Sequence, residues 1–258
     1  MSSFLDLSIW LLAYIAIVIA ISGWVQGALG LGFPMIATPL IAAVTTMQTA
    51  VIVVLIPCIA SVLANILRSP GFFKVLRRFW WMPLVAMPGA AIGAHLFVAY
   101  PDFPYALLLA GVILFYLNLD RLGFTQWVLM RSHEKKFGFL CGFLGGVSES
   151  TANIAAPPLI IYYLGIGLDP LLLVPAMNIS FLVGKITQFT TLASSGAATV
   201  NTWLLTLPLA ALALVMSLIG GRLRSRIDGV TYSRWVKRML FAMALLLLLQ
   251  AAYRQVTG

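Results

Sequence analysis

Two charged side chains, Glu149 and Lys185, lie deep inside apolar stretches of this sequence. An ionised group at the centre of a bilayer costs about 2.5–3.5 kcal/mol on insertion scales, so such residues persist where they are paired, line water or serve a function. One interpretation is a purely structural ion pair. The other, which we favour, is a binding site in which Lys185 holds a small anion and Glu149 titrates, coupling anion binding to a proton or another cation.

Polar residues at helical spacing accompany Lys185. Asn178 lies seven residues before it and Gln188 three residues after it, so all three are expected on one helix face. A lysine with two neighbouring amides suits an oxyanion. The alternative for the amides is hydrogen bonding between helices, worth only about 0.6 kcal/mol on average. Asn65 falls within one position of Lys185 when the two halves of the chain are aligned, which makes it a further candidate.

Glycine-rich segments interrupt two of the apolar stretches, at residues 27–34 and 145–153. We expect unwound backbone there, followed by short helices that begin near Phe33 and Asn153 and direct free N–H groups at an anion. Close helix packing is the alternative role for the glycines, and helix capping is the alternative for the hydroxyl and amide residues. The candidate binding residues at the two breaks are Gln26, Gly30, Gly32, Ser148, Ser150, Thr151 and Asn153.

The composition describes a membrane protein. Of the 258 residues, 62% are hydrophobic and 9% are charged, whereas soluble domains carry about 25% charged residues. The net charge of +9 resides in loops between apolar segments, so the expected neighbours are lipid headgroups rather than nucleic acid. Cys58 and Cys141 lack CxxC spacing and are interpreted as buried small residues. No cofactor is expected, and no metal-binding cluster is visible.

Apolar segments long enough for spanning helices, which need about 20 residues, occur six times. They are Val51–Leu67, Phe79–Ala99, Tyr105–Leu119, Leu171–Ala193, Trp203–Ile219 and Trp235–Ala252. The two interrupted stretches, Leu7–Val44 and Phe137–Leu164, are each expected to form two helical pieces. Each pair is either a re-entrant hairpin or two short crossing pieces.

The chain has two weakly similar halves. At an offset of 119 residues, Gly27 matches Gly146 and Pro39 matches Pro158. Fourteen of the sixteen Lys and Arg residues fall within residues 68–78, 121–136 and 222–238, and equivalent loops in the two halves carry opposite charge bias. Because basic loops face the cytoplasm, the halves are predicted to be inverted repeats, with both chain termini outside.

The predicted fold is therefore an all-α polytopic membrane protein. Each repeat has one glycine-broken helix pair and three full transmembrane helices. The first repeat covers residues 1–122, a basic cytoplasmic linker covers 123–136, and the second repeat covers 137–258.

The glycine breaks and the proline-bearing helices that follow them resemble the sulfite exporter TauE/SafE family. The residues that carry the resemblance are Gly27-Ala-Leu-Gly30-Leu-Gly32-Phe-Pro-Met-Ile-Ala-Thr-Pro39-Leu, Gly142-Phe-Leu-Gly145-Gly146 through Pro157-Pro158-Leu159, Gly89-Ala-Ala-Ile-Gly93-Ala and Ile219-Gly220-Gly221. The resemblance covers nearly the whole chain and implies a multi-pass carrier of sulfite, organosulfonates or related small anions in the bacterial inner membrane. The second break departs from the pattern, with Ser148-Glu149-Ser150-Thr151 in place of a glycine run.

We therefore expect a secondary transporter of a small sulfur-containing or carboxylate anion, coupled to protons or another ion. Two alternatives remain at this point. A lone membrane lysine with an acidic counter-ion also fits a retinal photoreceptor, and an intramembrane enzyme is the third possibility.

Overall fold

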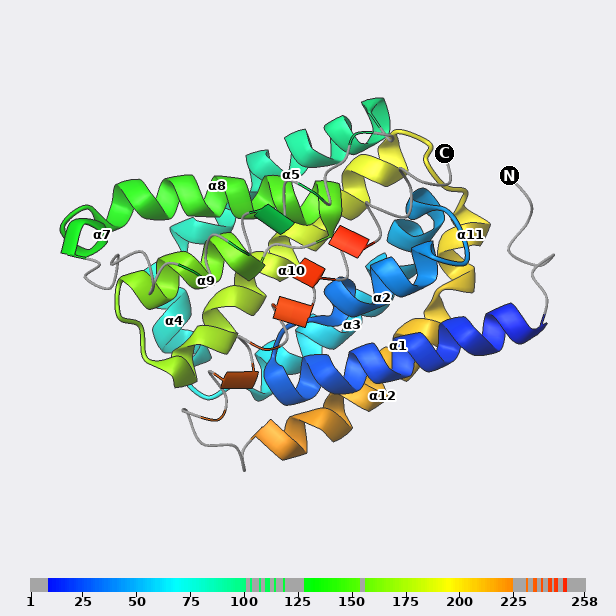
Figure 1. Ribbon diagram of the computed structural model, residues 1–258, viewed down its shortest axis with the longest axis horizontal. Coiled ribbons are helices and arrows are strands. Elements are labelled where there is room, and N and C mark those ends of the chain that lie inside the picture. The colour runs from blue at the N-terminus through cyan, green and yellow to red at the C-terminus, as the bar shows by residue number, and fades with distance from the viewer. Residues whose placement is uncertain are drawn as a thin grey trace.

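The computed structural model describes residues 9–100, 128–153 and 156–224, with isolated positions between 103 and 118 and between 231 and 249. The described part is helical and contains no strand (Figure 1). Its helices include five that are long and apolar enough to cross a membrane: Ile9–Leu29, Met47–Arg68, Trp81–Ala99, Leu172–Ser194 and Val200–Leu223. The chain is therefore a multi-pass membrane protein. The predicted spans Tyr105–Leu119 and Trp235–Ala252 lie mostly outside the described residues.

The helices form two runs with the same order of lengths. The first run comprises α1 (Ile9–Leu29), α2 (Phe33–Ala42), α3 (Met47–Arg68), α4 (Phe72–Phe79) and α5 (Trp81–Ala99). After the short α7 (Val128–Ser132), the second run comprises α8 (Glu134–Ala152), α9 (Ala156–Gly165), α10 (Pro170–Ser194), α11 (Val200–Leu205) and α12 (Leu207–Arg224). The second run thus begins at Glu134, inside the segment predicted as a linker.

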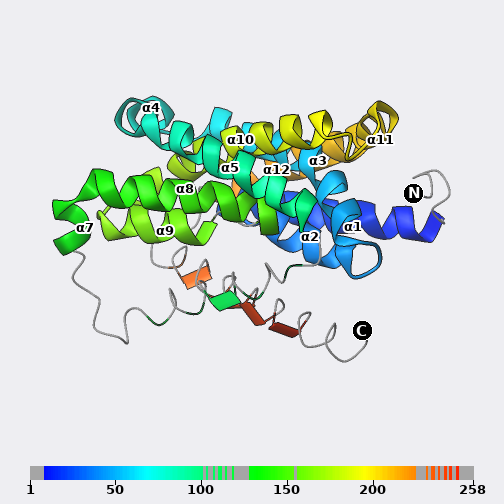
Figure 2. The same ribbon diagram turned by 90° about the horizontal axis from the view of Figure 1, so that it is seen from above.

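Helices α3 and α10 occupy the centre of the bundle. In their apolar windows, 72% of α3 and 61% of α10 is buried, against 33% for α1, 44% for α5 and 28% for the α11–α12 segment. Helix α3 packs against α2, α10 and α12, and α10 packs against α5 and α8. Figure 1 shows both helices in the middle of the view, and Figure 2 shows α10 beside α5. Polar side chains on α3 and α10 are therefore the ones best shielded from lipid.

Two close crossings between outer helices surround this centre. A Cβ atom at Gly27 of α1 would overlap the carbonyl oxygen of Ser217 on α12, and one at Gly146 of α8 would overlap that of Ala86 on α5. These are the two glycines that match at the 119-residue offset. Close packing is therefore their role, because only a residue without a side chain lets the backbones approach so far. Figure 1 shows α1 running from right to left and α8 from left to right.

We expect Gly146→Ala to destabilise the folded protein by about 1–3 kcal/mol, because the added methyl group meets rigid backbone rather than a movable side chain. Thermal unfolding in detergent measures the effect. Gly111→Ala is the matched control, since a Cβ atom at Gly111 meets nothing within 4 Å. Equal melting temperatures for the two variants would contradict the close crossing.

The first break separates α1 from α2. The chain is left-handed at Gly30 (φ 72°) and at Gly32 (φ 111°), and α2 begins at Phe33, the predicted position. Such backbone angles favour glycine because a Cβ atom would clash there. Pro34 follows in the first turn of α2, where its missing N–H costs little.

The second break differs from the prediction. Ser148, Glu149, Ser150 and Thr151 were expected in unwound backbone, but α8 stays helical through Ala152. The left-handed residue is Asn153 (φ 60°), a residue type that tolerates this conformation. Gly145 and Gly146 do not break the helix, and Gly146 is used for packing against α5. Glu149 is therefore held on a regular helical turn rather than in a loop.

The two pieces around each break are unequal in length. Helices α1 and α8 have 21 and 19 residues, whereas α2 and α9 have 10 each. Ten residues span about 15 Å, half of the roughly 30 Å hydrocarbon core. Helices α1 and α8 are therefore longer than two equal pieces that share one crossing would be, and α2 and α9 are shorter.

Candidate functional site

Lys185 lies at the centre of the bundle with its side chain fully buried, at 0% exposure. Its Nζ donates hydrogen bonds to Oδ1 of Asn153, at the end of α8, and to Oε1 of Gln188 (2.8 Å), one turn further along α10. Gln188 in turn donates to the backbone carbonyl of Ser150 (3.3 Å). An ammonium group has three donors; among the described residues two of them find an acceptor, and one remains for a further oxygen.

Glu149 supplies the opposite charge. Its Oε1 lies 3.9 Å from Nζ of Lys185, and its side chain is 4% exposed. At this distance the two groups attract each other without a direct hydrogen bond. Within the described part of the chain, no group donates a hydrogen bond to the Glu149 carboxylate. The other oxygen, Oε2, lies against Gly184, where a Cβ atom would overlap it. The pair is therefore buried but loosely joined, which leaves the carboxylate free to change partner.

A second polar cluster holds the first break and contains no charge. Gln26 of α1 donates to Oδ1 of Asn178 on α10 (3.1 Å), and Asn178 donates to the carbonyl of Gly30 (2.6 Å). Asn65 of α3 donates to the backbone carbonyl of Gln26 (2.8 Å). All three amide side chains are buried. Gln26 and Asn178 both donate to the carbonyl of Gly30 at the break. Asn65 adds a hydrogen bond to the carbonyl of Gln26, which also accepts the backbone N–H of Gly30.

A small cavity lies between the two clusters. Its volume is about 10 Å³, and it is lined by Gln26, Gly32, Pro34, Met35, Cys58, Val62, Glu149 and Phe181. This volume is roughly the minimum for a single water. The described conformation is therefore closed around the Glu149 carboxylate, and the cavity has no room for an anion larger than a water molecule.

The start of α2 offers fewer free N–H groups than the sequence predicted. The Phe33 N–H already donates to Oε1 of Gln26 (2.9 Å), and Pro34 has no N–H. The first helical turn of α9 holds Pro157 and Pro158, which also lack this donor. At the start of α2 the N–H of Phe33 is therefore not free, contrary to the expectation. Lys185 is the one fully buried cation among the described residues.

The candidate residues divide into three groups by position. Lys185, Gln188, Asn153 and Glu149 come together around the end of α8; Gln26, Asn178, Asn65 and Gly30 come together around the first break; and Gly32 lines the cavity between them. No hydrogen bond joins Asn65 to Lys185 in the described structure.

The hydroxyl residues of α8 do not gather around Lys185. Ser148 bonds to the carbonyls of Leu144 and Gly145, and Thr151 bonds to that of Val147, all on their own helix. Helical residues of this kind commonly bond back to the preceding turn. The hydroxyl of Ser150 is buried without a described partner, and only its backbone carbonyl contributes to the cluster.

Three residues of the site were missed by sequence reasoning. Thr38 of α2 accepts a hydrogen bond from Nδ2 of Asn153 (2.8 Å) and thereby joins the first half to the second break. Cys58 lines the cavity, although the prediction that it is buried is confirmed. Gly184 lies against the Glu149 carboxylate. Thr38 had a weak signal, as a hydroxyl in an apolar run. Cys58 and Gly184 had none.

The arrangement suits reversible binding better than bond-making chemistry. It offers one buried cation with an unused donor, one buried carboxylate beside it, and amides that fix both in place. Among the described residues, no group of three or more His, Cys, Asp or Glu side chains could hold a metal ion. Such a site can exchange one anion, the carboxylate, for another.

Comparison with known proteins adds one match. A family model described as "Sulfite exporter TauE/SafE" matches residues 15–250, nearly the whole chain. No curated protein and no solved structure matches this chain.

Proposed function

Because the chain belongs to the sulfite exporter TauE/SafE family, we propose that it is a secondary transporter that carries a small anion across the bacterial inner membrane. The family makes it a membrane transporter of the sulfite exporter type. The proposed substrates are sulfite, an organosulfonate such as sulfoacetate, or a related sulfur-containing or carboxylate anion. One observation carries the proposal: the buried ammonium of Lys185 holds two amide oxygens and keeps a third donor beside Glu149.

Coupling to protons follows from the neutrality of the buried pair. An anion that binds Lys185 while Glu149 stays ionised would leave a net negative charge in a region with little water, which is costly. Protonation of Glu149 removes that cost, so an anion and a proton favour each other's binding. Thermodynamic linkage makes the effect reciprocal: the substrate tightens proton binding by the same factor.

Transport also requires the site to open toward each side in turn. The cavity of about 10 Å³ is closed to such anions, so the helices that line it must move apart for substrate to enter. The opposite directions of α1 and α8 (Figure 1), together with the matching crossings at Gly27 and Gly146, support an inverted-repeat arrangement. In such transporters the two repeats exchange roles between the inward-open and outward-open states.

Flux into proteoliposomes tests the proposal. Purified protein is reconstituted with an acidic interior or exterior, and uptake of the anion itself is measured for sulfite, sulfate, thiosulfate, sulfoacetate, taurine and simple carboxylates. We expect at least one anion to be moved and the rate to depend on the pH gradient. Absence of flux for the whole series, from protein that is folded and inserted, would contradict anion transport.

Orientation has its own prediction. We expect the three basic segments to face the cytoplasm and the loop after α10, which carries no basic residue, to face outside. Cysteines introduced at Lys74 and at Ser195 report this in intact cells, and Cys58 and Cys141 give little background because both are buried. A membrane-impermeant reagent should label the cysteine at 195 and not the one at 74. The reverse pattern would refute the orientation.

The photoreceptor alternative gains no support from the site. The nitrogen of Lys185 that would bind a chromophore is hydrogen-bonded to Asn153 and Gln188, and the neighbouring cavity has room for about one water. The enzyme alternative is disfavoured by the family, whose members are transporters.

A further inference from the structure

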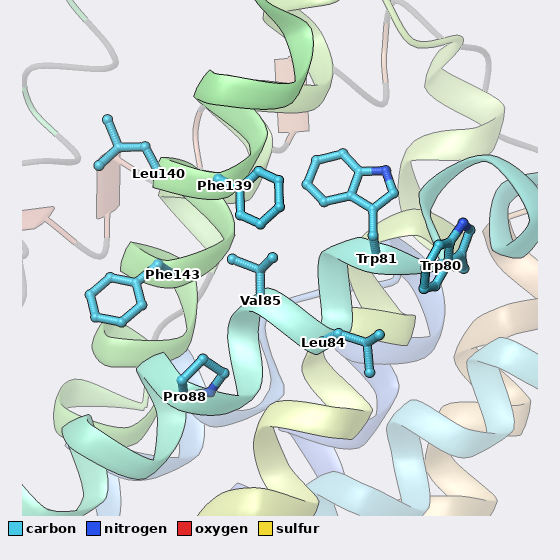
Figure 3. Close-up of a pocket in the computed structure, with 8 residues that line it drawn as sticks. All are labelled: Trp80, Trp81, Leu84, Val85, Pro88, Phe139, Leu140 and Phe143. Carbon is cyan, nitrogen blue, oxygen red and sulfur yellow. The ribbon is translucent and has the colours of Figure 1, made fainter.

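An apolar groove runs along the surface between the first halves of α5 and α8 (Figure 3). Its volume is about 790 Å³, within the range of about 300–1,000 Å³ that is usual for ligand sites. The residues that line it are Trp80, Trp81, Leu84, Val85, Pro88, Phe139, Leu140 and Phe143. None of these side chains is charged, so the groove suits a hydrocarbon chain.

The walls of the groove are firmly held. Trp81 stacks on Phe139 across the two helices, with ring centroids 5.3 Å apart and planes at 26°. Behind them α8 presents glycines to α5: a Cβ atom at Gly138 would overlap the ring of Trp81, and one at Gly142 would lie 2.7 Å from the sulfur of Met82. The close approach of the two helices sets the floor of the groove, and the large aromatic side chains beside it form its rim.

A second hollow of about 300 Å³ adjoins the groove. It is lined by His133, Lys136, Phe137 and Leu140, and Leu140 belongs to both hollows. At 1.5 Å per residue along a helix, Lys136 lies about 10 Å from Phe143 along the axis of α8. A polar, basic end and a long apolar end therefore follow each other along one helix.

Positive charge exceeds negative charge around the basic end. Glu134 is paired with Arg78, which links α8 to the end of α4 at 3.2 Å. The lysines Lys74, Lys135 and Lys136 are exposed and have no described carboxylate within 4 Å. Basic hollows between membrane helices are the usual places where anionic lipid headgroups bind.

We propose that this groove binds an anionic phospholipid, with an acyl chain along the aromatic walls and the phosphate at Lys136 and His133. The dimensions and the order of the two ends match such a lipid, which has a charged headgroup at the membrane surface and a chain that descends from it. A second copy of the chain fits less well, because a symmetric contact at this face would bring the same unpaired lysines together. A small free anion would leave the apolar groove unfilled.

Native mass spectrometry of the full-length protein, equilibrated with phosphatidylglycerol or with phosphatidylcholine, tests the proposal. We expect one phosphatidylglycerol to be retained in preference to phosphatidylcholine. Lys136→Gln should weaken this preference by about fivefold, the factor expected for one lysine near anionic headgroups. Lys74→Gln is the matched control: it removes the same charge from an exposed lysine that lines neither hollow.

A third variant tests the apolar part separately. Leu140→Trp fills the point where the two hollows meet, so it should reduce retention of phosphatidylglycerol while leaving every charge in place. The proposal is overturned if both lipids are retained equally, if Lys74→Gln weakens retention as much as Lys136→Gln does, or if the mass spectra show dimers whose formation Leu140→Trp abolishes. None of these variants touches the cluster around Lys185, so failure here leaves the transport proposal intact.

Discussion

Lys185→Met is expected to reduce anion binding by about 30-fold or more. The substitution keeps an unbranched apolar stem but removes the ammonium group that donates to Asn153 and Gln188. Losing one charged partner of a buried polar contact costs about 2–5 kcal/mol, and each 1.4 kcal/mol is a factor of ten in affinity. Isothermal titration with sulfite and the other candidate anions measures the loss.

The same variant leaves Glu149 without its cation, so a defect in folding must be separated from a defect in binding. Breaking a buried pair by removing one partner costs about 3–5 kcal/mol of stability, whereas removing both charges is often neutral. The double variant Lys185→Met with Glu149→Gln should therefore melt close to the unmodified protein and still fail to bind anions. If the double variant regains binding, Lys185 is a structural residue and the site lies elsewhere.

Glu149→Gln is expected to retain or strengthen anion binding and to lose the pH dependence of transport. Glutamine resembles the protonated carboxyl, so the anion no longer competes with a carboxylate for Lys185, and no proton is taken up with it. The expected result is an affinity at high pH that matches the affinity of the unmodified protein at low pH. Binding and liposome flux, measured from acidic to alkaline pH, report both effects.

Glu134→Gln is the matched control for this experiment. Glu134 lies on the same helix, but it is partly exposed and paired with Arg78 at the surface. It precedes Glu149 by 15 residues, about 22 Å along the helix axis. Its substitution should leave the pH profile of transport unchanged. An unchanged pH profile in Glu149→Gln would remove Glu149 from the coupling mechanism and leave only the ion pair.

The two breaks differ in the chemistry that holds them, although they occupy matching places in the chain. Uncharged amides from Gln26, Asn65 and Asn178 satisfy the first break. The second break is held by the Lys185 ammonium. Thr38 joins the two through Asn153. We therefore expect the structure around the second break to change with pH and with bound substrate. The structure around the first break, which is held by uncharged amides, should stay the same.

Several features of this protein were determined by the sequence alone. Composition and the length of the apolar segments indicated a multi-pass membrane protein, because a helix of about 20 apolar residues satisfies its own backbone hydrogen bonds and exposes only apolar side chains to lipid. The start of α2 at Phe33 followed from Gly32 and Pro34, whose backbone preferences are local. The burial of Lys185 with Asn178 and Gln188 on α10 followed from helical periodicity and the cost of exposing polar groups to lipid.

Tertiary structure alone decided the partners of these residues. The glycines at 145 and 146 resembled those of the first break, yet they lie inside α8, where Gly146 packs against α5 and Asn153 ends the helix. Ser148 and Thr151 turned back onto their own helix, while Thr38 of α2 and Cys58 of α3 reached the site from other segments, and Gly184 brought α10 against the Glu149 carboxylate. The physical reason is that a glycine or a hydroxyl has several low-energy uses, and the choice among them depends on neighbours that are distant in the sequence and close only in the folded bundle.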